Sequence, residues 1–209
     1  MNSKKTIETF LNDLASKAPA PGGGGASALT GALAAALSSM VCNLTAGRKK
    51  FADVQDEMQM VLEKTERIRA RFTELIDEDE EAFTGLMDGF KMPKESELEK
   101  TLRSEKIQSA TKKAALVPLE MMHHCCDLIP LAMAAAVKGN PNVISDAGVS
   151  ALLAGAAAQA AALNVHINLS GLKDRKWAQD KFAEMNRMLK EIREGTDRVM
   201  KVVTGKMSA

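Results

Sequence analysis

The spacing of apolar residues predicts a protein made of long helices. Apolar side chains recur every three or four positions through most of the chain, which is the period of a helix with one buried face. The clearest repeat alternates steps of four and three, as in packed helical seams. It predicts one helix over about residues 51–90 and consists of Val54, Met58, Val61, Thr65, Ile68, Phe72, Leu75, Asp79, Ala82 and Leu86.

The other apolar stripes predict five more helices. Pro118 and Pro130 fall inside the one that follows a Ser96–Glu99 capping box, so we expect a kink or a division there. The predicted fold class is all-α, a multihelical up-and-down bundle of long helices that associate through their faces. Nothing in the composition marks a linker, so we expect one domain over 1–209. The five helices are expected over about 4–17, 26–46, from 97 onward, 146–169 and 174–203.

Two stretches, 18–47 and 147–172, contain no charged residue. Their length permits a membrane-spanning interpretation. However, Ser, Thr, Asn or Gln recurs every few positions in both, and the mean hydropathy of the chain is −0.14. We therefore expect buried helices that pack through small residues, and no membrane association.

The overall composition argues against a nucleic-acid-binding protein. The net charge is +1, aromatic residues make up 3% of the chain, and there is no Tyr. Such a chain offers neither a basic surface nor many stacking platforms for bases. The three cysteines, an odd number without framework spacing, indicate reduced thiols and a cytoplasmic protein.

A glycine-rich stretch opens the first uncharged helix. Pro19 and Pro21 end the preceding helix, and Gly22–Gly25 follow directly. The N-terminus of a helix carries free N–H donors and a partial positive charge, which suits an anion. A phosphate-binding P-loop is a poor alternative, because no strand precedes the glycines and no Gly-Lys-Ser/Thr follows them. A flexible connection is the other interpretation.

Asp79 stands where the apolar seam requires a residue such as Leu. A buried carboxylate without a partner costs several kcal/mol, so Asp79 must be paired or used. We weigh an ion pair inside an oligomer interface against a functional carboxylate. The neighbouring acids are expected to form a solvated face; they are Asp77, Glu78, Glu80 and Glu81.

A second polar group lies in and around the other uncharged helix. Asn164 and Asn168 stand one turn apart in an apolar run and need hydrogen-bond partners, either in neighbouring helices or in a ligand. The turn before this helix contains Asn140, Asn142 and Ser145, and Asp146 follows.

His123, His124, Cys125 and Cys126 form a cluster that suggests a metal site. Successive helical residues point about 100° apart, so four in a row do not close a tetrahedron. We predict no metal.

Six segments together resemble one family, the formiminotransferase-cyclodeaminase C-terminal domain, which includes stand-alone methenyltetrahydrofolate cyclohydrolases. The resemblance covers almost the whole chain. His166 departs from it, because many relatives are expected to carry a cation such as Arg there, and Gly25 extends the glycine run. The segments are Pro19–Gly24, Met40–Phe51, Ile76–Phe83, Ala115–Leu119, Gly139–Gly148 and Asn164–Leu169.

This resemblance implies a folate substrate, an all-α fold and a homodimer or larger homo-oligomer. Two reactions occur in the family, hydrolysis of 5,10-methenyltetrahydrofolate and closure of 5-formiminotetrahydrofolate with release of ammonia. We expect the hydrolysis, because no formiminotransferase domain is present in the chain; the cyclodeaminase, served by a separate formiminotransferase, and a non-catalytic folate-binding protein are the alternatives. We expect no cofactor beyond the tetrahydrofolate substrate.

The chemistry of the substrate suggests roles for the candidate residues. The methenyl carbon is cationic, so Asp79 is the expected general base, and Asp146 is expected to bind the pterin or move a proton. The glycines, with Arg48, Lys49 and Lys50, are expected to hold the anionic glutamyl tail. The predicted substrate-binding residues are Pro21, Gly22, Gly23, Gly24, Lys49, Lys50, Phe83, Asn140, Asn142, Ser145, Asn164 and Asn168.

Overall fold

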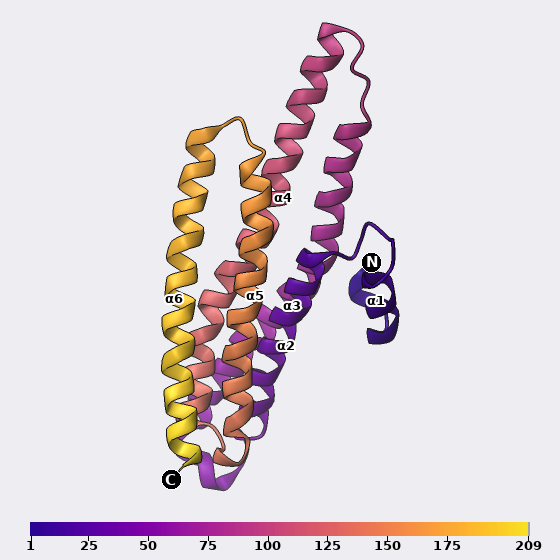
Figure 1. The fold of residues 1–209 in the computed structure, drawn as a ribbon. Helices are drawn as coiled ribbons and strands as arrows, with labels where there is room; N and C mark the ends of the chain where they lie inside the picture. Colours follow the sequence, from indigo (N-terminus) through magenta and orange to yellow (C-terminus); the bar gives the residue numbers. More distant parts are fainter. Residues whose placement is uncertain (209) are drawn as a thin grey trace.

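The computed structural model describes residues 1–208 and is built from helices (Figure 1). This confirms the all-α prediction. The α-helices are α1 (Ile7–Leu14), α2 (Gly23–Asn43), α3 (Gln55–Lys91), α4 (Glu97–Lys138), α5 (Ile144–Ser170) and α6 (Arg175–Met207). Three short 3-10 turns, η1 (Asn2–Lys4), η2 (Lys49–Val54) and η3 (Pro141–Val143), precede α1, α3 and α5.

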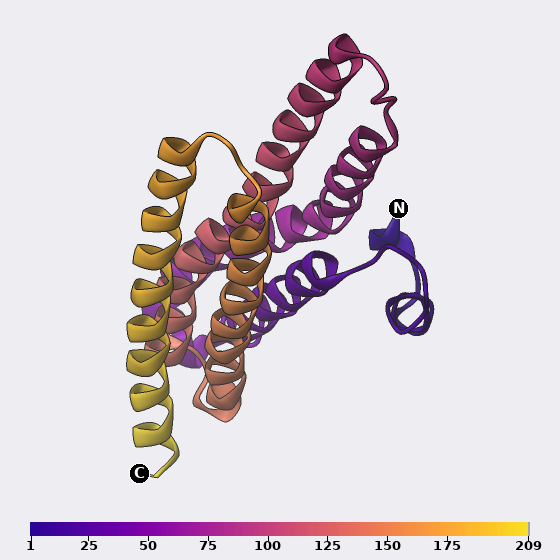
Figure 2. The same ribbon diagram turned by 45° about the horizontal axis from the view of Figure 1, so that its top comes forward.

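Three predicted boundaries need correction. α2 begins at Gly23 rather than near Ala26, so the glycines form its first turn and not a loop. α4 runs undivided through Pro118 and Pro130, because its neighbours pack along its length and offset the hydrogen bonds that proline removes. α1 is shorter than predicted and stands to one side of the bundle (Figure 2).

The uncharged helices α2 and α5 lie side by side and run antiparallel. Ser38 of α2 bonds Ser150 of α5 at 2.8 Å, while Gly23 lies beside Asn164 and Asn140 bonds Thr45. α3 packs on α2, α6 packs on α5, and α4 contacts all of them. The uncharged helices α2 and α5 are each long and apolar enough to cross a membrane. However, 56% of the most apolar 18-residue segment of each is buried inside the bundle.

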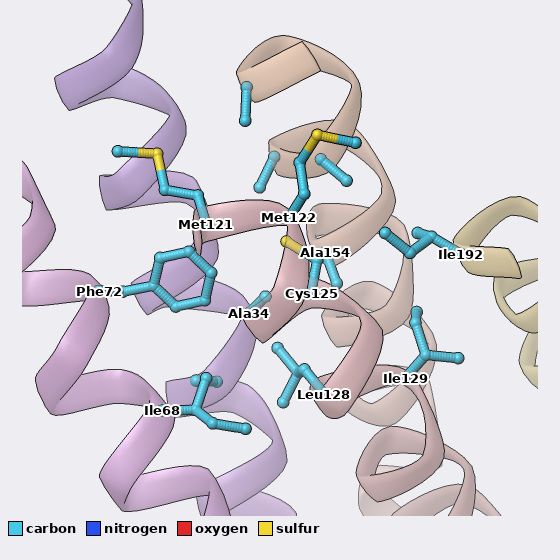
Figure 3. Packing of buried hydrophobic residues seen from close by; sticks show 14 of the residues in the cluster. Ala34, Ile68, Phe72, Met121, Met122, Cys125, Leu128, Ile129, Ala154 and Ile192 are labelled. Carbon is cyan, nitrogen blue, oxygen red and sulfur yellow. The ribbon is translucent and has the colours of Figure 1, made fainter. Parts of the chain in front are cut away.

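The core lies where α4 crosses the other helices (Figure 3). Phe72, Met121, Met122, Cys125 and Leu128 are fully buried there. Small residues set the helix spacing: a Cβ added to Gly31 would lie 2.4 Å from the Phe72 ring. The predicted buried face of α3 is confirmed, because the positions of the repeat from Met58 to Leu75 are all buried.

Candidate functional site

A cavity of about 350 Å³ lies at the end of the bundle where α2 begins. The first turn of α2, the C-terminal half of α3 and the last turns of α5 form its walls. Seven residues that the sequence singled out line this one cavity: Gly22, Gly23, Gly24, Asp79, Phe83, Asn164 and Asn168. Pro21 is buried directly behind them, with its ring 3.4 Å from the Cβ position of Gly25.

Asp79 lies against the first turn of α2. A Cβ on Gly24 would sit 2.0 Å from Asp79 Oδ1, so only glycine allows this approach. Gly22 caps α2 and has no side chain to accept from the first amides. The Asp79 carboxylate takes that role by accepting the Gly25 N–H, and it faces the positive end of the helix.

The environment of Asp79 favours its neutral form more than water does. Burial raises the pKa of Asp79, and the Gly25 N–H opposes this shift without cancelling it. A carboxylate with a raised pKa in a cavity is better suited to accept and return a proton than an ordinary aspartate. Asp79 thus contacts another element of its own chain, and no cation pairs with it among residues 1–208.

The helix end where we expected the glutamyl tail already faces a carboxylate. A second anion placed at the same N–H groups would be repelled by ionised Asp79. The part of the cavity beside Asp79 therefore fits a substrate group that is cationic or that donates hydrogen bonds.

Of the two roles that the sequence left open for Asn164 and Asn168, the structure shows hydrogen bonds within the protein. The amide nitrogen of Asn168 donates to the Ala114 carbonyl of α4 at 3.1 Å and to the Asn164 carbonyl, and that of Asn164 donates to Ala160. These bonds orient both side chains. Neither Oδ1 accepts a hydrogen bond from residues 1–208, so two amide oxygens remain as acceptors at the cavity wall.

The acids beside Asp79 do not form the solvated face that we expected. Asp77 accepts from the backbone N–H of Ser3 at 3.1 Å, and Glu78 shares Arg71 with Glu120. Burial works against ionisation of Asp77, but the hydrogen bonds from Ser3 and Asn2 outweigh it and lower its pKa. Of these four acids only Glu81 is exposed. Asp77 and Glu80 are partly covered by the N-terminal segment, and Glu78 is partly covered by Arg71.

The other predicted site residues lie at the opposite end of the bundle. Asp146 is 18 positions before Asn164 on the same helix, which places it about 27 Å away. Asn140 serves the turn there, because its side chain bonds the Leu44 carbonyl and the Asn142 N–H. This end also carries Lys49, Lys50, Asn142 and Ser145, all of which are exposed.

The His-Cys cluster is spread over separate surroundings. His123 bonds Glu184 at 2.7 Å, His124 contacts Glu120, and Cys125 is fully buried in the core. Burial raises the pKa of the Cys125 thiol. Among residues 1–208 no three side chains of the metal-ligating types gather at one point.

Sequence reasoning missed Glu80, which also lines the cavity. It stands three residues before Phe83 and so shares a helix face with it. That spacing is the signal that could have separated Glu80 from the neighbouring acids.

The fold and the cavity together define a helical-bundle protein with a cavity lined by two carboxylates, two asparagines and a helix N-terminus. A family model described as formiminotransferase-cyclodeaminase matches residues 6–187. This chain belongs to that family.

Individual relatives agree with this assignment. The chain is 47% identical over 208 residues to methenyltetrahydrofolate cyclohydrolase of Methylorubrum extorquens, with full coverage of both chains. It is 30% identical to formimidoyltransferase-cyclodeaminase of Mus musculus, of which it spans 34%. Among solved structures it matches formiminotetrahydrofolate cyclodeaminase from Thermotoga maritima with a TM-score of 0.89 and 31% identity, over 98% of each chain.

Proposed function

We propose that this chain is an enzyme of folate one-carbon metabolism that hydrolyses 5,10-methenyltetrahydrofolate to 10-formyltetrahydrofolate. The observation that carries the proposal is the partly buried Asp79 carboxylate, whose pKa is raised, in a cavity that Glu80, Asn164 and Asn168 also line. The 47% identical relative, matched over its whole length, bears the name of this activity.

The substrate's charge and donors match the pocket. The methenyl carbon bridges N5 and N10 as a cationic amidinium, which a carboxylate stabilises in a dry cavity. No Lys or Arg lines this cavity, so nothing there repels the cation. The pterin ring adds N–H donors that suit the oxygens of Asn164 and Asn168.

Asp79 is suited to move the protons of the hydrolysis. As water attacks the methenyl carbon, ionised Asp79 accepts one proton, and a carbinol forms. The C–N5 bond then breaks, the carbinol oxygen becomes the formyl carbonyl as its proton leaves, and N5 gains a proton that Asp79 can return. One proton is released overall. Proton transfer by a positioned group contributes roughly 10²–10⁴-fold to the rate.

The cyclodeaminase reaction is the second candidate. The structural relative at TM-score 0.89 and the mouse protein both carry that name. Incubation of the purified chain with each folate separates the two. Loss of methenyl absorbance without ammonia supports the hydrolase, whereas ammonia release from formiminotetrahydrofolate, with methenyl absorbance appearing, supports the cyclodeaminase. If neither change occurred, the result would contradict both proposals. A separate formiminotransferase would be the partner in the second case.

The outer face of α2 and α5 fits a second copy of this chain. Large aliphatic side chains project from it without a charged residue, among them Leu33 (50% exposed), Leu152 (48%) and Leu163 (74%). Two helices about 30 Å long and about 10 Å wide present roughly 600 Å² per copy, and about 1,200 Å² in total reaches the size of a stable interface. A face that contacts itself across a two-fold axis needs no other partner.

Such a pair would bring the two ends of the bundle together. A two-fold axis perpendicular to α2 and α5 reverses their direction in the second copy, so it lays the glycine end of one copy over the Asp146 end of the other. Asp146, Lys49 and Lys50 of a partner would then approach the cavity that holds Asp79, consistent with their prediction as site residues.

The oligomeric state tests this assembly. Leu152→Asp places a charge in the middle of the face and should convert the oligomer to monomer in light scattering. Leu98→Asp is the matched control, because Leu98 is 69% exposed on the α3–α4 hairpin, away from this face. An unchanged oligomer in Leu152→Asp would exclude this interface.

We also propose a cytoplasmic location, and a reaction without metal or further cofactor. Burial of the α2 and α5 windows within the bundle and the unpaired cysteines support the location. Full activity of the purified enzyme after treatment with a chelator, and its fractionation without detergent, are the expected results.

A further inference from the structure

The N-terminal segment is fastened to α3 at two points one turn apart. The backbone N–H of Ser3 donates to Asp77 Oδ1 at 3.1 Å, and the Ser3 hydroxyl donates to Asp77 Oδ2. The side-chain nitrogen of Asn2 donates to Glu80 Oε2 at 3.0 Å. Figure 2 shows the chain's N-terminus beside the middle of α3.

The Asn2 contact does more than anchor the segment. Asn2 is 3% exposed, and its Oδ1 is buried without a hydrogen-bond partner among residues 1–208. An unpaired buried acceptor is destabilising. The paired bonds between Ser3 and Asp77 already hold the segment in place, so anchoring alone does not require Asn2. Its specific effect is to fix the carboxylate of Glu80.

The second carboxylate oxygen of Glu80 is free. Glu80 lines the same cavity as Asp79, and its Oε1 receives no hydrogen bond from residues 1–208. The two carboxylates differ in their surroundings. Asp79 is drawn against Gly24 and accepts from Gly25, whereas Glu80 is held from behind by Asn2.

We propose that Glu80, positioned by Asn2, binds the hydrogen-bond-donating edge of the pterin ring. This edge carries a ring N–H beside an amino group, and the free Oε1 of Glu80 can accept a charge-assisted hydrogen bond from it. Asn164 and Asn168 offer only neutral amide oxygens, and Asp146 of the same chain is about 27 Å away. The inference rests on the proposed folate activity and assigns the specificity of the same pocket.

A substrate that lacks the amino group isolates this contact. The probe is the 2-desamino-2-methyl analogue of methenyltetrahydrofolate, assayed beside the natural substrate. Wild-type enzyme should prefer the natural substrate by about 10- to 100-fold in kcat/KM, the range expected for a charge-assisted contact. Glu80→Gln should lose most of that preference through a higher KM for the natural substrate, with kcat changed little.

Two further variants test the positioning by Asn2 and control for the loss of charge. Asn2→Ala leaves the carboxylate in place but unheld, so it should reduce the preference by a smaller factor in the same direction. Glu81→Gln removes the same charge from the exposed neighbour and should keep the full preference.

The outcomes separate this proposal from the proposed function. If folded Glu80→Gln still preferred the natural substrate over the analogue as strongly as wild type, the role of Glu80 would be overturned. Turnover of the natural substrate by the wild-type enzyme would still support the proposed reaction. If Glu80→Gln fails to fold, unchanged preference in folded Asn2→Ala overturns the positioning, and a reduced one supports it.

Discussion

The two ends of the α2–α5 pair carry candidate residues of similar kinds, yet only one end forms a cavity within the chain. At the glycine end Asp79 is partly buried and touches the start of α2, and Asn164 and Asn168 line the same cavity. At the other end Asn140 is occupied with the turn, and the lysines are exposed.

This difference shows what separates a reactive carboxylate from an ordinary polar one. Both Asp79 and Asp146 are acids near the start of an uncharged helix. Only Asp79 reaches such a helix from a different element, so burial and a backbone N–H act on it together. Asp146 lies in the first turn of its own helix, where an acid is favourable in any protein.

The largest expected effect is the loss of the Asp79 charge. Asp79→Asn keeps the shape of the side chain but removes the base, so kcat for methenyltetrahydrofolate should fall by about 10²–10⁴-fold. The absorbance assay measures this, with circular dichroism as the check on folding. Normal turnover in folded Asp79→Asn would end its assignment as the general base.

Gly24→Ala tests the close approach at the same end. The new methyl group would occupy the position of the Asp79 carboxylate and displace it, so activity should fall by about 100-fold, as expected for a misplaced catalytic group. Thermal stability should change little, because alanine is the better helix former. Gly205→Ala is the control, since its Cβ meets nothing within 4 Å. Equal activity of the two variants would contradict the prediction.

Mixed oligomers test whether the two ends meet across copies. Asp146→Ala should lower activity by about 10- to 100-fold if it contacts substrate. When Asp79→Asn and Asp146→Ala chains are co-expressed, half of the dimers are mixed and one of their two sites is intact, which restores about a quarter of wild-type activity for an isologous pair. Activity no higher than that of the separate variants would place both residues in one copy or remove Asp146 from the site.

The smallest expected effect is on the pH dependence of stability. Burial raises the pKa of Asp79 above its unfolded value, so the folded protein binds this proton more tightly than the unfolded chain. The stabilisation from this proton is therefore present at low pH and is lost as pH rises through the folded pKa. Denaturation from pH 4 to 8 should show Asp79→Asn gaining stability relative to wild type as pH rises. A constant difference would mean that burial does not perturb Asp79.

Much of the fold was predictable because its signals are local. The period of Val54 to Leu86 fixes the register of α3, and the absence of charge in 18–47 and 147–172 identifies the central helices. The boundaries at Gly23 and across Pro118 were wrong. Intrinsic preferences disfavour helix at both, but packing against neighbouring helices outweighs them.

The candidate site was predictable only in part. Asp79 was identifiable alone, because a carboxylate in an apolar register contradicts its surroundings. For Glu80 the local spacing to Phe83 indicates only a shared helix face, because its hydrogen bond comes from Asn2, 78 positions away in the chain.

The sequence by itself determined the helices, their buried faces and the one acid that does not belong on such a face, since each follows from neighbours within a few residues. Only the tertiary structure decided that Asp79 meets Gly24, that Asn164 and Asn168 line the same cavity, and that Asp146 lies at the far end. These facts depend on α2 and α5 packing antiparallel. Helix direction in a bundle is set by long-range packing, which no local pattern records.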